Sequence, residues 1–351
     1  MKSLLNRNRL SIESFTPQVL LLLIVVLMVL VAWSLASGPI ELSLVQSLFS
    51  VWDRVWGSDL SSLQQFEQVV VWDLRLPRTL LALMVGALLA QCGAVMQGIF
   101  RNPLADPGII GVASGAALGA AIAIVVLPVS IQWLTVPVFS FVGGLLTTWL
   151  VYGLAKNESG TSVVILLLAG VAISAFGGAI IGFLTYIADD QSLRDLSLWQ
   201  MGALASATGW DLLLCGVILF IVMVLFQKQA QALNALLLGE SEARHLGIEV
   251  EKLKQQFIVI TAVGVGIAVS VSGVIGFVGL VVPHLVRMLV GPDHRILLPL
   301  SAVLGAALLL LADLGARTWM SPAEMPVGLV TAGLGAPFFM ALLFQRRKSL
   351  I

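Results

Sequence analysis

The sequence predicts an all-α polytopic membrane protein with about ten transmembrane helices. The prediction rests on its composition, its charge-free intervals and the placement of its basic residues. Hydrophobic residues make up 59% of the 351 positions and charged residues only 11%, whereas soluble domains average about 45–50% and 25%. The mean hydropathy is +1.02. The formal net charge is zero, so no overall basic field points to nucleic acid as a partner.

Intervals without Asp, Glu, Lys or Arg locate the individual helices, because a helix needs about 20 apolar residues to cross the hydrocarbon layer. These intervals are 14–40, 79–100, 107–155, 159–188, 212–227, 255–286, 296–312 and 325–345. The third can hold two helices, with a break near Pro128 and Gln132. A single helix over 255–286 would be about 48 Å long, which is too long. The cluster of Gly273, Gly276 and Gly279 therefore predicts a short second helix at about 279–290.

The distribution of Lys and Arg supports ten helices with both termini in the cytoplasm, because basic residues concentrate in cytoplasmic loops. Ten helices place fourteen of the 19 basic residues inside. Those left outside are Arg54, Arg75, Arg78, Arg194 and Arg317. Nine helices would split the basic residues ten to nine and move 346–348 outside. We therefore expect one transmembrane domain over 1–351, with a short cytoplasmic N-terminal segment at 1–16 and no cleaved signal peptide.

Motifs that carry chemistry are missing from the sequence. It contains no GxxxxGK[ST] phosphate loop, no HExxH, no GxSxG and no Cys/His cluster. The two cysteines, Cys92 and Cys215, lie in apolar runs, which excludes a disulfide framework. We expect no catalytic residue, no metal site and no bound cofactor in this chain.

The segment 228–254 is the most informative loop on the predicted cytoplasmic side. Its stretch 239–247 fits a short surface helix with a small apolar face and charged residues around it. The apolar face would contain Leu238, Ala243 and Leu246, and the charged residues are Glu240, Glu242 and Arg244. Two interpretations stay open on this pattern alone: a solvated loop helix, or a docking helix for a soluble partner.

Two further features have a structural and a functional interpretation. Arg75 and Arg78, in the sequence RLPR, begin the second span on the outer side, and Arg317 ends the ninth there, one turn after Asp313. They are either interfacial anchors or a cationic rim that binds acidic groups of a partner. The turn-rich segment 101–111 joins the second and third spans and must face water or protein.

Glycines recur at four-residue spacing in two predicted spans, at Gly111, Gly115 and Gly119 and again at Gly178 and Gly182. Small residues at this spacing are typical of close helix packing in membranes. The alternative is a set of thin helices that slide around a pathway, and the sequence does not separate the two.

Several long blocks resemble one family. They read RLPRTLLALMVGALLAQCGAVMQGIFRNPLADPGIIGVASGAA at 75–117, LGESEARHLGI at 238–248, GFVGLVVPHLVRMLVGPDHRILLP at 276–299, ADLGAR at 312–317 and EMPVGLVTAGLGAPFFMALL at 324–343. In order and content they are similar to the permease subunits of bacterial ABC importers for vitamin B12, ferric siderophores and haem. The resemblance covers essentially everything after residue 70.

The resemblance implies a type II ABC importer permease fold, a homodimer and a location in the bacterial inner membrane. It implies that two cytoplasmic ATPase subunits, which bind the ATP, dock on 238–248, so that Gly239, Glu240, Glu242, Ala243, Arg244, Leu246 and Gly247 couple ATP hydrolysis to transport. It implies that a periplasmic binding protein docks on Arg75, Arg78 and Arg317. A cytoplasmic gate is implied at Asn102, Leu104, Thr161 and Ser162.

The stretch DLSLWQMGALASATGW at 195–210 is more similar to haem permeases than to the others, so haem is the expected cargo, with a ferric siderophore or vitamin B12 as the alternatives. An ion-coupled secondary transporter would need carboxylates in mid-membrane, and the single acidic residue within a predicted span is Asp313. A membrane enzyme would need clustered Asp or His residues near one interface, and none stands out.

Overall fold

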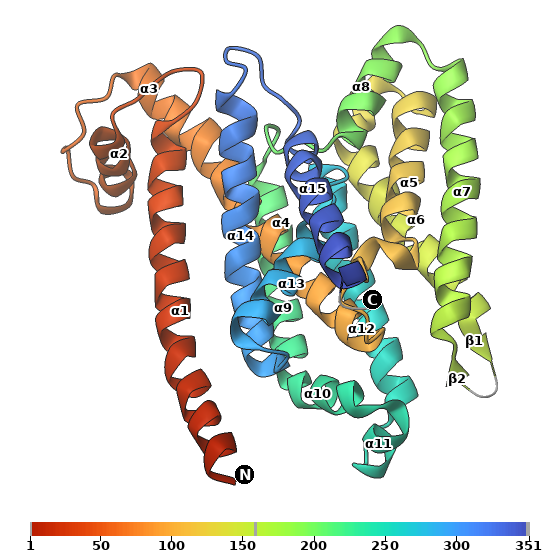
Figure 1. Cartoon of the computed structure of the whole chain (residues 1–351). Helices are drawn as coiled ribbons and strands as arrows, with labels where there is room; N and C mark the ends of the chain where they lie inside the picture. The colour runs from red at the N-terminus through yellow and green to blue at the C-terminus, as the bar shows by residue number, and fades with distance from the viewer. Residues whose placement is uncertain (1, 158–159, 349–351) are drawn as a thin grey trace.

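The computed structural model describes residues 2–157 and 160–348. Met1, in the expected N-terminal segment 1–16, and residues 349–351 of the expected single domain lie outside this part of the chain. The described part is almost entirely helical (Figure 1), which confirms the predicted all-α class.

Within residues 2–157 and 160–348, ten apolar helices form the bundle. They are α1 (Lys2–Ala36), α4 (Leu76–Ile99), α5 (Val112–Val126), α6 (Gln132–Ala155), α7 (Val163–Ile187), α9 (Gly209–Lys228), α12 (Val250–Ser272), α13 (Val278–Val290), α14 (His294–Thr318) and α15 (Val327–Lys348). Among the described residues, seven candidate spans are long and apolar enough to cross a membrane, and the shorter apolar helices are 112–126, 278–290 and 327–341. Each of the ten predicted helices therefore has a counterpart.

Short elements connect these helices at both ends. They are α2 (Leu44–Trp56), α3 (Gln65–Val69), η1 (Val70–Arg75), η2 (Pro107–Ile110), η3 (Val129–Ile131), β1 (Lys156–Asn157), β2 (Gly160–Thr161), α8 (Asp190–Gln200), α10 (Ala230–Leu238) and α11 (Glu240–His245). In Figure 1, α2, α3 and α8 lie at one end of the bundle, while α10, α11 and the β1–β2 hairpin lie at the other, with the N-terminus. We call the first end, which is the predicted outer side, the outer end, and the second, which is the predicted inner side, the inner end.

Helix α4 is the centre of the bundle. In the apolar window of the span that contains it, 83% of residues are buried, against 17% in α1, α7 and α9. Glycines allow its neighbours to approach closely: a Cβ added at Gly93 would overlap the carbonyl group of Gly279 in α13, and one at Gly86 would overlap that of Gly305 in α14. Because α4 is buried on every side, the elements at both ends of the molecule are positioned relative to this one helix.

The glycine stripes of α5 and α7 differ. Added Cβ atoms at Gly115 and Gly119 would overlap the backbone of α6, at Gly143 and Phe139, so this stripe is used for close packing, the first of the two interpretations left open by the sequence. Around Gly178 and Gly182 of α7 no described atom of the chain lies within 4 Å of the added Cβ. The α7 stripe therefore faces outward from the subunit.

The predicted break after 272 is confirmed, since α12 ends at Ser272 and α13 begins at Val278. Gly273 and Phe277 both have positive φ, at 66° and 68°, which ends the helical path. The second span begins earlier than predicted, because α3 and the π-helical η1 continue into α4 and form one apolar helix over Gln65–Ile99. Pro77 lacks an N–H, and the wider π turn before it accommodates this, with Leu76 N–H bonding to the Val71 carbonyl group.

Candidate functional site

The predicted docking helix is present at the inner end. α10 and α11 are separated by Gly239, whose φ of 129° only glycine adopts readily. The Ala243 side chain is completely buried, whereas Leu238 and Leu246 are 68% and 64% exposed. The predicted apolar face is therefore divided: Ala243 packs α11 onto the subunit, and the two leucines are free to contact another protein.

A cluster of charged residues joins α11 to the hairpin that precedes α7. The ammonium group of Lys254 lies 2.7 Å from Glu240 Oε1 and 3.2 Å from Glu251 Oε1. It also donates to the Thr161 carbonyl group at 3.4 Å. Glu251 Oε2 accepts from the Thr161 N–H at 2.7 Å. We call Lys254, Glu240, Glu251 and Thr161 the inner cluster. It brings one predicted coupling residue and one predicted gate residue together.

The four predicted gate residues lie in two separate segments, the loop after α4 and the junction between β2 and α7. Thr161 ends β2 and is buried, and Ser162 caps α7 by accepting from the Ile165 N–H at 3.4 Å. Asn102 is exposed, and its Oδ1 accepts from the Leu104 N–H at 3.0 Å, which fixes a tight turn. The loop that contains Asn102 and Leu104 reaches α7 through η2, where the backbone of Ile109 lies against Gly170.

A second polar contact holds α10 to the start of α14. Asn234 donates to Asp293 Oδ1 at 2.7 Å and accepts from the His294 N–H at 2.8 Å. Asp293 also pairs with Arg295 at 2.6 Å. The hydrogen bonds from Arg295 and Asn234 lower the pKa of Asp293 to about 2, so this carboxylate is charged at neutral pH.

The outer arginines, for which the sequence left interfacial anchors and a cationic rim open, are buried in this chain. Arg75, Arg78 and Arg317 are only 4%, 8% and 2% exposed. Arg78 lies 2.8 Å from Asp313 and 2.7 Å from Glu324, and Arg317 lies 3.3 Å from the other oxygen of Asp313. The expected Asp313–Arg317 pair is therefore present, and it belongs to a buried network. Docking by these arginines stays a prediction, and in this chain alone all three are buried.

Backbone carbonyl groups complete the outer network. Arg75 donates to the carbonyl groups of Leu35, at 2.8 Å, and Ala36, at 2.6 Å, and also to that of Ile40. Arg317 donates to the Ser34 hydroxyl group and, at 3.3 Å, to the Ser37 carbonyl group. We call Arg75, Arg78, Arg317, Asp313 and Glu324 the outer cluster. It ties the outer end of α1 to α4 and α14.

The sequence reasoning missed helix α2, which lies beside the outer end of α1 (Figure 1). Val45, Leu48, Phe49, Trp52, Val55 and Trp56 follow helical spacing and are all exposed. This spacing of three and four residues was the signal that could have predicted an amphipathic helix. An apolar, tryptophan-rich face at this end suits the membrane interface.

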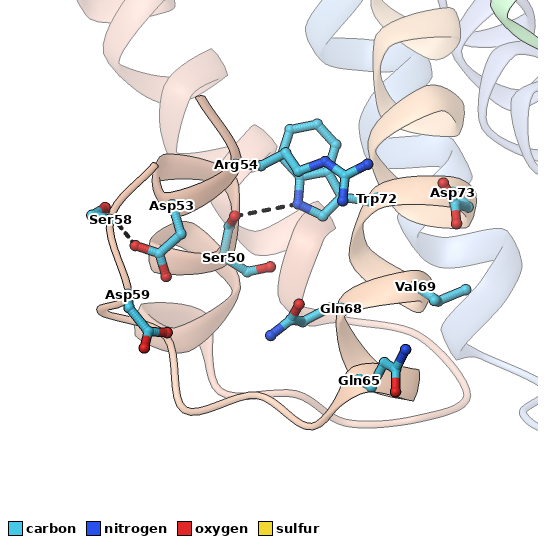
Figure 2. Close-up of a pocket in the computed structure, with 10 residues that line it drawn as sticks. All are labelled: Ser50, Asp53, Arg54, Ser58, Asp59, Gln65, Gln68, Val69, Trp72 and Asp73. Carbon is cyan, nitrogen blue, oxygen red and sulfur yellow. Dashed lines mark hydrogen bonds between the residues drawn. The ribbon is translucent and has the colours of Figure 1, made fainter. Parts of the chain in front are cut away.

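A polar cavity of about 370 Å³ lies between α2 and the α3–η1 segment. Figure 2 shows the Arg54 side chain beside the Trp72 ring, 5.7 Å from its centroid, and the indole N–H directed at the Ser50 carbonyl group, 3.2 Å away. Burial would raise the pKa of Asp53, but hydrogen bonds from Ser58, Leu60 and Ser61 lower it overall. Two pairs of side chains around the cavity thus contact each other, Arg54 with Trp72 and Ser58 with Asp53. Among the described residues, no group of three or more His, Cys, Asp or Glu residues could hold a metal ion.

These features define a class. Among the described residues, a bundle of ten apolar helices with short connecting elements at both ends has the structure of a polytopic membrane protein. The structure matches a metal-chelate type ABC transporter solved in an inward-facing conformation, with a TM-score of 0.80 and 35% identity, covering 94% of this chain and 99% of that one. A weaker match, to PsaBC from Streptococcus pneumoniae, has a TM-score of 0.56 and 16% identity and bears on the fold alone.

The chain belongs to the FecCD transport family, whose model matches residues 21–345. The hemin transport system permease protein HmuU of Yersinia pestis is 49% identical over 283 residues, which is 79% of this chain and 84% of that protein. The vitamin B12 import system permease protein BtuC of Vibrio vulnificus is 40% identical over 304 residues, which is 87% of this chain and 91% of that protein. This protein is therefore a permease subunit of an ABC transporter, and the predicted ABC importer function is confirmed.

Proposed function

We propose that this permease imports haem across the bacterial inner membrane, from the periplasm to the cytoplasm. The observation that carries the choice of cargo is the 49% identity to a hemin transport permease. Family membership decides against the ion-coupled carrier, and Asp313 suits that role poorly, because its carboxylate lies between Arg78 and Arg317. The alternative cargoes are vitamin B12, favoured by the 40% identity to BtuC, and a ferric siderophore.

Two cytoplasmic ATPase subunits bind the ATP and dock on α11. The support is the exposure of Leu238 and Leu246 beside the charged Glu242 and Arg244, on a short helix that stands away from the bundle (Figure 1). Movement of α11 then opens the pathway to one side of the membrane at a time. Asn102, Leu104, Thr161 and Ser162 form the gate on the cytoplasmic side.

A second copy of the chain completes the transporter, with the pathway between the two copies. The open glycine face of α7 supports this arrangement. Val164, Leu168 and Val171 on the same helix are each more than 60% exposed, and no described atom fills the space beside Gly178 and Gly182. Close helix contact in a membrane depends on small residues of this kind.

A periplasmic binding protein docks at the outer end. Arg78 is the arginine most accessible to it, because its partner Glu324 has a side chain that is 37% exposed. An acidic group of the binding protein would then compete with Glu324 for Arg78.

The cargo is tested with the transporter as it exists, namely the permease with its own ATPase and binding protein. Proteoliposomes are loaded with ATP, and uptake of haem, vitamin B12 and a ferric siderophore is compared. Haem uptake that needs both ATP and the binding protein is expected. Uptake driven by an imposed ion gradient without ATP would contradict the mechanism. Uptake of vitamin B12 alone would make vitamin B12 the cargo in place of haem.

The orientation is tested by labelling single cysteines in intact cells, since the native Cys92 and Cys215 are buried. We expect a cysteine at exposed Asp190, at the outer end, to react with a membrane-impermeant reagent, and one at exposed Glu242 to react only after lysis. The reverse result would invert the proposed topology.

A further inference from the structure

We infer that Lys254 is a positioning residue that joins the docking helix α11 to the gate hairpin β1–β2, so that displacement of one moves the other. The inference rests on the proposed function, because it requires an ATPase to displace α11. Its physical basis is a buried ammonium group shared by three separate segments of the chain.

Lys254 is 2% exposed, and each of its three N–H donors has an acceptor within reach. The acceptors are Glu240 Oε1 at 2.7 Å, Glu251 Oε1 at 3.2 Å and the Thr161 carbonyl group at 3.4 Å. They come from α11, α12 and β2. Since a buried charge is costly without its partners, the three segments are held together by one group.

The hairpin is held through its main chain. Thr161 donates its N–H to Glu251 and offers its carbonyl group to Lys254. Gly160 makes room for this contact: its φ is 120°, and an added Cβ would lie 2.7 Å from Glu251 Oε1. The position of the gate segment therefore depends on the inner cluster rather than on the Thr161 side chain.

Within the docking segment, α10 is fixed to the bundle, whereas α11 can move relative to it. Asn234 in α10 is hydrogen-bonded to Asp293 and His294 at the start of α14. Helix α11 follows after Gly239, where the backbone turns with a positive φ. Of the polar contacts described above, the one that links α11 to the bundle is Glu240–Lys254. An ATPase that displaces α11 therefore acts on Lys254 first, and through Lys254 on Thr161.

The test measures coupling in proteoliposomes that contain the full transporter. Lys254→Met keeps an unbranched side chain, one atom shorter than lysine, and removes the charge. Lys252→Met is the matched control, because Lys252 lies on the same helix, has a 67% exposed side chain and pairs only peripherally with Glu249 at 3.5 Å. We expect Lys254→Met to lower the number of haem molecules imported per ATP at least fivefold while basal ATP hydrolysis changes less than twofold. Lys252→Met should stay within twofold on both measurements.

A second pair of variants keeps the test decisive if Lys254→Met does not fold. Glu240→Gln removes the charge that α11 contributes. Glu249→Gln is the matched control, because it changes an exposed carboxylate just after α11 and outside the docking residues. We expect only Glu240→Gln to lower the import ratio, by about threefold or more. If the double variant Lys254→Met with Glu240→Gln folds, its import ratio should be no lower than that of Lys254→Met alone. Lys254→Arg keeps the positive charge and should have an import ratio between those of Lys254→Met and the wild type.

The outcomes separate the two claims. A wild-type complex that neither hydrolyses ATP in response to its binding protein nor imports any of the three cargoes would overturn the proposed function. A wild-type complex that imports one of them, with Lys254→Met or Glu240→Gln coupled as tightly as its control, would overturn only the role of Lys254. Lower thermal stability with an unchanged import ratio would show a purely structural residue and would overturn it as well.

Discussion

The outer and inner ends of this permease bury basic side chains in different ways. At the outer end, Arg78 and Arg317 share Asp313, and Arg78 also pairs with Glu324. Arg75 and Arg317 donate to backbone carbonyl groups and a hydroxyl group of the α1 region. At the inner end, one lysine is shared by two carboxylates and a backbone carbonyl group. The outer cluster ties long packed helices together, whereas the inner cluster ties a six-residue helix and a two-stranded hairpin to α12.

This difference separates stability from coupling. Loss of Asp313 leaves two buried guanidinium groups between long spans without their shared carboxylate, so the fold suffers. Loss of an inner contact releases a small element at the end of the bundle, so the fold persists while force transmission suffers. Each of the following predictions compares the two ends.

The largest effect is expected at Asp313, which is completely buried and contacts both Arg78 and Arg317. Asp313→Asn leaves two guanidinium groups without their shared carboxylate. Breaking a buried pair in this way costs about 3–5 kcal/mol. We expect the amount of folded permease recovered from membranes, measured by size-exclusion chromatography, to fall severely. Asp190→Asn, at an exposed position of α8, is the control and should be recovered like the wild type.

The sequence predicted the helices well because charge-free length and glycine positions are local properties. The break at 273–277 and the short helix α13 follow from such signals. The Asp313–Arg317 pair was also predictable, since i and i+4 residues share a helix face. The fold of the bundle could thus be read largely from the distribution of apolar residues.

The burial of the outer arginines could not be predicted, because Arg78 and Asp313 are 235 positions apart. The same holds for Thr161 and Lys254, which are 93 positions apart. Residue type and topology placed each group on the correct end of the bundle, but the partner of each charge depends on how distant helices pack. The gate and the docking helix were thus predicted separately, and only the structure joins them.

Asp293 lies at the inner end of α14, whose outer end contains Asp313, and we expect an intermediate effect there. Asp293→Ala removes the helix cap and the contact with Asn234, at a cost of about 1–2 kcal/mol. The hydrogen bonds from Arg295 and Asn234 lower the folded-state pKa to about 2 from 3.8. The stabilisation is therefore present above the unfolded-state pKa and is lost as the pH falls towards 2.

Thermal unfolding of the purified permease in detergent measures this effect. The difference between the wild type and Asp293→Ala should be constant from pH 7 to about pH 5 and shrink between about pH 4 and pH 2. A difference that stays constant down to pH 2 would show that the charge of Asp293 contributes nothing.

A smaller effect on stability is expected at Glu240. Its side chain is 30% exposed, and Lys254 keeps Glu251 when Glu240 is changed. Glu240→Gln should therefore cost about 1 kcal/mol, a loss well below that of Asp313→Asn in the same unfolding assay. A loss equal to that of Asp313→Asn would remove the distinction between a stabilising outer cluster and a transmitting inner one.

The smallest effect on stability is expected at Glu324, the exposed carboxylate of the outer cluster. Its side chain is 37% exposed, and Arg78 keeps Asp313 when Glu324 is changed. Glu324→Gln should change the free energy of unfolding by less than about 0.5 kcal/mol, because partly exposed ion pairs contribute little.

Glu324→Gln should nevertheless raise the affinity of the permease for the binding protein severalfold, because Arg78 is freed for an acidic group of that partner. Surface plasmon resonance with the immobilised binding protein measures this, with exposed Asp190→Asn as the control. An unchanged affinity would show that Arg78 stabilises the fold and does not bind the binding protein. The two ends of the molecule would then differ only in how much their charged clusters stabilise the fold.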